Sequence, residues 1–211
     1  QLQPKASIAW QMTEDHLLYT TYSKGFRSGG FNEYSPSVIR NYDQEVSDTV
    51  ELGIKTTWLD GKVWLNMALF HIEQQDAQFT RLNPETFTLE NLNIDKVSID
   101  GFELEMSAAI TDNLSINFGL GLIDNEITKN RGVDILSGRD LAATEGGTMP
   151  YVSDFNLNGS IDYSRELFGD YMLKTRLAFN TLGPRSFDIF NEDTGESDTQ
   201  TYLNANIAVE N

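Results

Sequence analysis

The sequence predicts an all-β fold, an antiparallel up-and-down sheet, and three observations carry that prediction. Apolar and polar residues alternate with a period of two along several segments, as side chains do on the two faces of a strand. Short connections, such as Asp60-Gly61 and 165–170, alternate with long polar ones, at 27–44, 79–95, 125–150 and 183–200. No apolar run approaches the roughly 18 residues of a membrane-spanning helix. Tight turns at one edge and long loops at the other are typical of a transmembrane β-barrel.

The first expected strands lie at 4–12 and 17–25, and the next at 45–59. In the third of these, Leu52 and Ile54 share one face, while Glu51 and Lys55 lie on the other. Asp60-Gly61 then predicts a tight hairpin, because a type I′ turn needs positive φ at both central residues. The strand that follows, at 62–79, alternates less cleanly, and its outward face stays open.

Around Gly101 the apolar residues of a later expected strand change from one face to the other. Val97 and Ile99 occupy odd-numbered positions before the glycine, whereas the apolar residues after it occupy even-numbered positions. A glycine inside a strand often marks a bulge that shifts the register. We therefore expect a bulge at Gly101, with Glu103 and Glu105 on the polar, inward face.

The clearest alternation is at 114–122, where Ile116 and Phe118 lie opposite Asn117. Similar segments at 151–163, 171–182 and 202–210 bring the expected count to about nine strands. Aromatic residues near the short turns fit a girdle at the lipid headgroups; they are Trp10, Trp58, Tyr163 and Tyr171. A soluble β-sandwich would also alternate, but these strands are long for one, and every second connection is long.

Composition excludes several functions. The 211 residues include 15 Lys and Arg against 32 Asp and Glu, for a net charge of -17, which argues against nucleic acid as a partner. There is no Cys, and therefore no disulfide or thiol chemistry. The acidic residues gather in the long connections, where they solvate exposed loops. A role for them in Ca²⁺ or Mg²⁺ binding has the right ligand chemistry but no recognisable spacing.

An odd number of strands does not close an ordinary bacterial barrel, and the sequence ends on Asn211 rather than on an aromatic residue. Its short turns recur at intervals that suit hairpins with long outer loops, which the largest barrels possess. We therefore expect residues 1–211 to be part of one larger barrel domain, with the closing strands elsewhere.

The motifs resemble those of TonB-dependent outer-membrane receptors. They occur in that family's order over most of the chain, at residues 18–32 (LYTTYSKGFRSGGFN), Glu45, 50–55 (VELGIK), Asp60-Gly61, Phe70, 76–78 and 100–105 (DGFELE). The resemblance implies a partial barrel of about nine strands from a 22-strand transmembrane β-barrel in the outer membrane of a Gram-negative bacterium. A plug domain and a TonB box have no counterpart in these residues.

The resemblance further implies TonB-energised uptake of a scarce nutrient, most simply a ferric siderophore, with membrane lipid, lipopolysaccharide, the plug and the TonB complex as partners. The outer loops would capture the nutrient through aromatic surface and Arg, whose rigid fork of donors suits carboxylate or catecholate groups. The candidate ligand contacts are Arg27, Phe31, Tyr34, Arg81, Phe87, Arg131, Arg139, Arg185 and Phe187. Each Arg could instead pair with a neighbouring carboxylate.

The inward carboxylates and lysine have a different expected role. Glu51, Lys55, Glu103 and Glu105 are expected to form a network on the lumen wall or to meet the plug, since a hydrated lumen lets them stay ionised.

Two other functions remain open from the sequence. A passive porin differs by lacking a plug. A barrel hydrolase would need one of the two histidines, His16 or His71, and the G-x-S-x-G nucleophile motif is absent. For His71 a structural hydrogen bond or a lumen-facing side chain accounts better for its position. We therefore expect no catalytic residue, metal site or cofactor.

Overall fold

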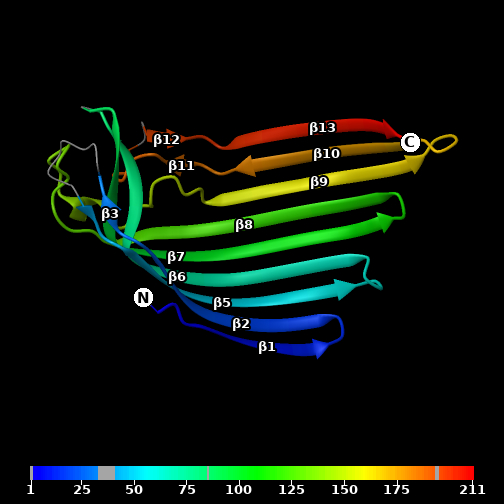
Figure 1. The fold of residues 1–211 in the computed structure, drawn as a ribbon, viewed down its shortest axis with the longest axis horizontal. Coiled ribbons are helices and arrows are strands. Elements are labelled where there is room, and N and C mark those ends of the chain that lie inside the picture. The colour runs from blue at the N-terminus through cyan, green and yellow to red at the C-terminus, as the bar shows by residue number, and fades with distance from the viewer. Residues whose placement is uncertain (1, 33–40, 85, 193–194) are drawn as a thin grey trace.

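The computed structural model describes residues 2–32, 41–84, 86–192 and 195–211. Nine strands form one antiparallel sheet in the order β1-β2-β5-β6-β7-β8-β9-β10-β13 (Figure 1). Their bounds are Lys5–Thr13 (β1), His16–Arg27 (β2), Glu45–Trp58 (β5), Val63–Asn83 (β6), Thr88–Thr111 (β7), Leu114–Lys129 (β8), Phe155–Glu166 (β9), Met172–Leu182 (β10) and Gln200–Glu210 (β13). Each strand pairs with its predecessor in the sheet, which confirms the up-and-down topology.

Among the residues that the structure describes, the long connections contain two small ribbons and the helical turn at Leu141–Thr144. The ribbons pair β3 (Gly30–Phe31) with β4 (Asn41–Tyr42) and β11 (Arg185–Ser186) with β12 (Glu196–Ser197). The turn is a 3-10 helix, η1, at Leu141–Thr144. Within the described residues, no helix has the length and apolar character needed to cross a membrane.

The turns that follow β1, β5, β7 and β9 lie at one end of the sheet, and the long connections and the tip of the β6–β7 hairpin lie at the other (Figure 1). The turn between β5 and β6 has φ of +53° at Asp60 and +85° at Gly61, as the sequence predicted. Its closing hydrogen bond runs from the Lys62 N–H to the Leu59 carbonyl at 3.2 Å. The two ends are called the turn end and the loop end below.

The cross-strand register divides the sheet into an apolar face and a polar face. One row of paired residues runs across Ile54, Met67, Leu104, Leu120 and Leu157. These side chains all lie on the apolar face, because directly paired residues of an antiparallel sheet share a face. The sequence left open which residues of β6 point outward, and this row of pairs answers the question. The odd-numbered residues of β6 from 63 to 69 lie on the apolar face.

The apolar face is exposed over much of its area. On β5 it extends from Val50 to Trp58, nine residues, close to the roughly 9 to 11 residues that span a bilayer as a tilted strand. Leu52 is 49% exposed, Leu69 56% and Leu203 75%. Such a large apolar surface indicates that another apolar phase covers it.

The polar face carries a continuous hydrogen-bonded ladder from β7 to β10. Ser107 Oγ donates to Asn117 Oδ1 at 2.8 Å, and Asn117 Nδ2 donates to Ser160 Oγ at 3.3 Å. Asp162 then accepts from Ser160 at 3.0 Å and pairs with Arg176 at 3.3 Å. Polar side chains therefore satisfy one another along this face, which is consistent with a wet surface.

The predicted bulge at Gly101 is wrong. The register between β6 and β7 runs without a shift from Val63↔Ala108 to Gln75↔Lys96. Gly101 instead makes room for its partner Phe70, because an added Cβ would lie 2.0 Å from the Phe70 ring. The apolar residues of β7 change face because Val97 and Ile99 lie on the inner face at the loop end. Val97 belongs to a buried core there, and Ile99 packs against it. Glu103 and Glu105 do lie on the polar face.

The segment 79–95, expected to be a polar loop, is mostly strand. β6 continues to Asn83 and β7 starts at Thr88, and their pairing continues to Asn83↔Thr88. Figure 1 shows this part of the hairpin turning away from the direction of the sheet. The bend occurs near Asp76, whose φ is +53°. β8 likewise extends to Lys129, beyond its expected end.

The buried apolar core of the described chain lies at the loop end. Ile94, Val97 and Ile127 are fully buried there, and Ile189, 5% exposed, reaches them from the connection before β13. Away from this core, the only buried apolar residue in the described part of the chain is Ala108. The loop end thus has a buried apolar core that the rest of the described sheet lacks.

Candidate functional site

The connection between β2 and β5 is fastened to the bent hairpin by Gln78. Gln78 Nε2 donates to the carbonyls of Ser28 and Asp43, each at 2.9 Å. Its backbone N–H donates to the Glu45 carboxylate at 2.8 Å. Gln78 is only 7% exposed, so its amide is held within this junction by the carbonyls that it joins.

Asparagines make a second set of fastenings. Asn32 and the backbone of Asn91 exchange two hydrogen bonds, each 2.9 Å long. Asn93 Nδ2 donates to the carbonyls of Asp43 and Asp76, at 3.0 and 2.7 Å. These bonds join the β2–β5 connection to both strands of the hairpin.

Two glycines let that connection pack closely. A Cβ on Gly29 would lie 2.5 Å from the Tyr42 carbonyl oxygen, and one on Gly30 would lie 2.4 Å from the Tyr42 hydroxyl. The Ser-Gly-Gly sequence is therefore a packing requirement of the loop end.

Arg81 is the centre of a buried charge cluster on the hairpin. Its guanidinium hydrogen-bonds to the Asp134 carboxylate and lies 3.6 Å from Glu90 Oε2. Asn83 Nδ2 donates to the other oxygen of Glu90 at 3.0 Å. Glu90 is fully buried and Asp134 is 7% exposed. Arg81 thus bridges the hairpin to the loop at 130–150.

Asp134 is held in its ionised form. Burial alone would raise its pKa, but hydrogen bonds from Arg81 and from the Ser137 hydroxyl and backbone outweigh burial, so the pKa of Asp134 lies below its usual value. The Ser137 hydroxyl donates at 2.6 Å and its N–H at 3.0 Å. This carboxylate closes the turn at 134–138 and neutralises Arg81 at the same time.

A second arginine joins the loop at 130–150 to the one at 185–192. Arg139 pairs with Glu192, and its guanidinium stacks 3.7 Å from the centre of the Phe190 ring. Asn191 reinforces the junction, because its amide donates to the Thr148 carbonyl at 3.0 Å and accepts from the Thr148 N–H at 2.7 Å.

These contacts enclose a cavity of about 520 Å³, called the loop cavity below. It is lined by the residues Phe79, Thr80, Arg81, Leu82, Asp134, Leu136, Ser137, Arg139, Tyr151, Phe187, Asp188, Ile189, Phe190 and Glu192. The rings of Tyr151 and Phe187 lie 5.8 Å apart, and Arg185 lies 5.5 Å from the Phe187 ring. Seven of these fourteen residues are apolar or aromatic and the other seven are polar or charged, so the cavity offers a small ligand both kinds of contact.

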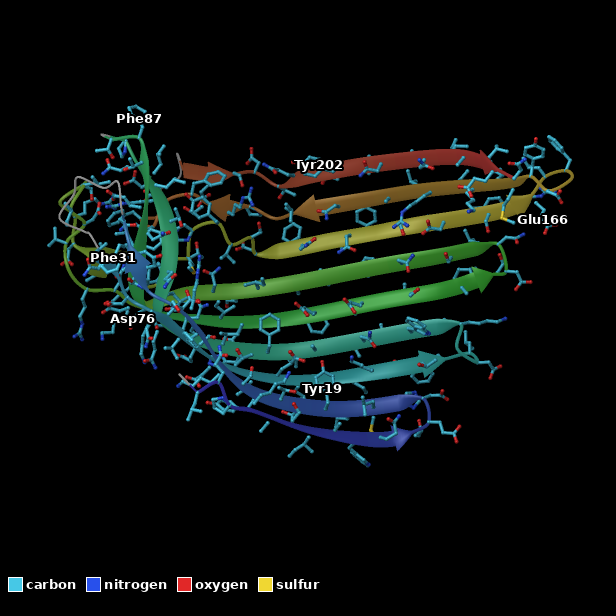
Figure 2. The ribbon with its side chains drawn as sticks, in the orientation of Figure 1. Tyr19, Phe31, Asp76, Phe87, Glu166 and Tyr202 are labelled. Carbon is cyan, nitrogen blue, oxygen red and sulfur yellow. The ribbon has the colours of Figure 1, made fainter. Side chains whose placement is uncertain are left out.

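The structure brings four of the candidate contacts to or beside the loop cavity, namely Arg81, Arg139, Arg185 and Phe187. Arg81 and Arg139 are already engaged by carboxylates, as the alternative for each Arg foresaw. Figure 2 shows Phe31 and Phe87 at separate points of the loop end, and they are 75% and 82% exposed.

The other candidates lie apart from the cavity. Arg27 ends β2, where it is exposed, and Arg131 is exposed at the start of the loop that follows β8. Tyr34 lies outside the described residues.

The four residues expected on the lumen wall lie on the polar face. Glu51 and Lys55 occupy alternate positions of β5, and Lys55 Nζ lies 5.8 Å from the centre of the Tyr19 ring. Glu103 and Glu105 line a hollow of this face together with Asn66 and Asn117. Their contact with a plug stays a prediction.

His71 lies on the apolar-face side of β6, which makes the lumen-facing alternative wrong and the structural hydrogen bond correct. His71 Nδ1 is 2.9 Å from Asp100, and Nε2 is 3.5 Å from Glu73. Among the described residues, no three His, Asp or Glu side chains come together in a way that could hold a metal ion.

Pattern reasoning missed the residues that hold the loop end together. Gln78 and Asn32 were visible only as parts of family motifs, and Asn93 and Asn191 carried no signal apart from being polar residues in expected loops. Phe190 was an aromatic residue in an expected loop, the same signal that selected Phe187, whereas Tyr151 was expected to begin a strand.

The architecture defines the class of protein. The sheet has nine up-and-down strands, one apolar and exposed face, one polar face, and long structured loops at one end. These are the features of part of the wall of a large β-barrel. The model of the family "TonB dependent receptor-like, beta-barrel" matches residues 1–210. The chain therefore belongs to the TonB-dependent receptor β-barrel family.

Relatives in sequence are receptors. The chain is 32% identical over 157 residues to the probable TonB-dependent siderophore receptor PiuA of Acinetobacter baumannii, covering 70% of this chain and 20% of that protein. It is 26% identical over 194 residues to the pesticin receptor of Yersinia pestis, covering 89% of this chain and 26% of that protein. The chain thus spans about a fifth to a quarter of the length of these relatives.

Solved structures share the fold. The ferric yersiniabactin uptake receptor FyuA from Yersinia pestis superposes with a TM-score of 0.76 at 23% identity, over 98% of this chain and 29% of that one. The siderophore receptor PiuA from Acinetobacter baumannii gives a TM-score of 0.72 at 24% identity, over 96% of this chain and 28% of that one.

Proposed function

We propose that this chain forms part of the wall and outer loops of a Gram-negative outer-membrane receptor that captures a metal chelate, most simply a ferric siderophore, for TonB-energised uptake. Membership of the receptor family carries the proposal, and the names of the relatives, which include a siderophore receptor and a metal-pseudopaline receptor, support the choice of cargo. The TonB complex would act with segments other than those described.

The loop cavity is the proposed point of capture on this part of the receptor. Its aromatic rings would contact the organic shell of the chelate, while Arg185 and Phe187 would form its rim. Phe31, Phe87, Arg27, Arg131 and Tyr34 are proposed as outer contacts. The paired Arg81 and Arg139 would hold the cavity open and in shape.

The exposed apolar face would lie against membrane lipid, and the carboxylates at its loop-end rim would meet the lipopolysaccharide headgroups. The polar face would line the lumen, where Glu51, Lys55, Glu103 and Glu105 would face the plug. A hydrated wall of this kind lets a large solute pass once the plug has moved.

The test is uptake of radiolabelled iron by a strain whose copy of the receptor is replaced with variants of the full protein. Tyr151→Ser combined with Phe187→Ser is expected to lower uptake at limiting chelate by about thirtyfold, because each lost aromatic contact weakens binding by roughly 1 kcal/mol. The matched control is Phe168→Ser at the turn end, where the ring is 72% exposed.

A collapse of the proton gradient separates receptor from passive porin. Uptake that stops with an uncoupler supports energised transport, whereas uptake that continues unchanged, or a double variant equal to the Phe168 control, would contradict the proposal.

A further inference from the structure

The loop end is strongly acidic. Across residues 79–92, 130–150 and 185–200 the sequence holds four arginines, no lysine and ten carboxylates. The lining of the loop cavity shows the same imbalance, since Arg81 and Arg139 face Asp134, Asp188 and Glu192 there. A trianionic ligand entering this region would meet net repulsion.

The arginines of the lining are already neutralised. Arg81 lies between Asp134 and the fully buried Glu90. Taking Arg81 from them for a ligand would remove a guanidinium from beside two buried carboxylates, which is costly. The more exposed Arg139 is fixed twice, by Glu192 and by stacking on Phe190.

Aromatic surface remains available for contact. Tyr151 and Phe187 are 48% and 44% exposed, and together with Phe190 they line the cavity. Aromatic rings in a negative field bind apolar and positively charged groups well, since ring faces attract cations.

We infer that the loop cavity selects a neutral or positively charged metal chelate with apolar or aromatic groups and disfavours polyanionic chelates. The inference rests on the proposed function and specifies its substrate class. It also replaces the expectation that Arg81 and Arg139 bind carboxylate or catecholate oxygens of the ligand: in this arrangement their role is to balance the carboxylates around them.

The experiment compares two synthetic iron complexes on the purified full-length receptor. A tripodal trihydroxamate gives a neutral ferric complex, and a tripodal tricatecholate of the same framework gives a trianionic one. Binding is followed by quenching of intrinsic fluorescence. The neutral complex is expected to bind at least about tenfold more tightly, and the gap is expected to narrow as salt screens the repulsion.

A charge variant assigns the selectivity to this cavity rather than to loops elsewhere in the receptor. Glu192→Gln is expected to tighten binding of the trianionic complex several-fold and to leave the neutral complex nearly unchanged, because it removes one negative charge beside Arg139. Asp170→Asn, at the exposed turn between β9 and β10, removes the same charge at the turn end and is expected to change neither affinity.

The inference would be overturned if the receptor bound the trianionic complex more tightly than the neutral one. It would also be overturned if Arg139→Gln abolished binding of the trianionic complex and left binding of the neutral complex unchanged. Either outcome would leave the proposed function intact. Failure of both complexes to bind would overturn the inference too, and continued iron uptake through the receptor in cells would then show that the proposed function survives.

Discussion

The loop end and the middle of the sheet are stabilised in different ways. At the loop end, Ile94, Val97 and Ile127 are fully buried and the charges of Arg81, Glu90 and Asp134 are paired. In the middle of the sheet, the apolar face stays exposed, and the polar face is joined by hydrogen bonds between side chains.

The difference shows which part of the molecule depends on its surroundings. Residues far apart in the sequence bury one another at the loop end, so its packing is supplied by the chain itself. The middle of the sheet has backbone pairing but no cover on its apolar face, and its stability depends on an apolar medium. Variants at the two places should therefore respond to different conditions.

The largest effect is expected from Arg81→Ala. The change removes the guanidinium that lies beside the buried carboxylates of Glu90 and Asp134, and removing one partner of a buried pair costs about 3 to 5 kcal/mol. Hydrogen exchange should show faster opening of 79–92 and 130–150, with unchanged protection of the sheet. Arg131→Ala, at an exposed position in the same loop, is the control; equal protection in the two variants would disprove the bridging role.

A substitution on the apolar face should act through the membrane. Phe118→Arg places a charge toward the lipid and is expected to cost about 2 to 4 kcal/mol near the midplane, whereas Asn117→Arg on the polar face should cost little. Refolding of the full barrel into lipid vesicles measures both. If the two variants refold equally well, the assignment of the faces to lipid and lumen is wrong.

The sequence predicted the sheet because each strand residue meets one of only two environments. The alternation at Ile116, Asn117 and Phe118 therefore identified the two faces correctly, and Asp60-Gly61 identified its turn through backbone strain that few residues tolerate. Both signals are local, which is why they could be interpreted without tertiary contacts.

The loop end could not be predicted in the same way, because its contacts join distant segments. Arg81 and Asp134 are 53 positions apart, and Asn32 and Asn91 are 59 apart. The phase change at Gly101 was misinterpreted for the same reason: Val97 is buried at the loop end in one core with Ile189. The polar segment at 79–95 was also expected to be a loop. It forms paired strands through backbone hydrogen bonds, which leave no alternation of apolar residues in the sequence.

A smaller effect is expected at Gly101 on the polar face. Gly101→Ala would place a Cβ about 2.0 Å from the Phe70 ring, and such overpacking costs about 1 to 3 kcal/mol. Gly121 lies in the neighbouring row of the same face, and a Cβ added there would have no atom within 4 Å, so Gly121→Ala is the matched control. Thermal unfolding in detergent compares them, and equal melting temperatures would show that Phe70 moves aside freely.

The smallest effect concerns pH at the bend of the hairpin. Desolvation, followed by the nearby charges of Asp43 and Asp95, raises the pKa of Asp76 above its usual value. A group whose pKa is raised on folding favours the folded state at low pH and loses that contribution as pH rises through the folded pKa. Ionised Asp76 therefore slightly destabilises the bend at neutral pH.

Asp76→Asn should consequently slow proteolysis of the loop end modestly at neutral pH and make no difference below about pH 3, where the carboxyl is protonated in either state. Asparagine also tolerates the φ of +53° found at this position, so the backbone should not change. Faster cleavage of the variant at neutral pH would show that the carboxylate supports the bend, and the repulsion between the three aspartates would then be too weak to matter.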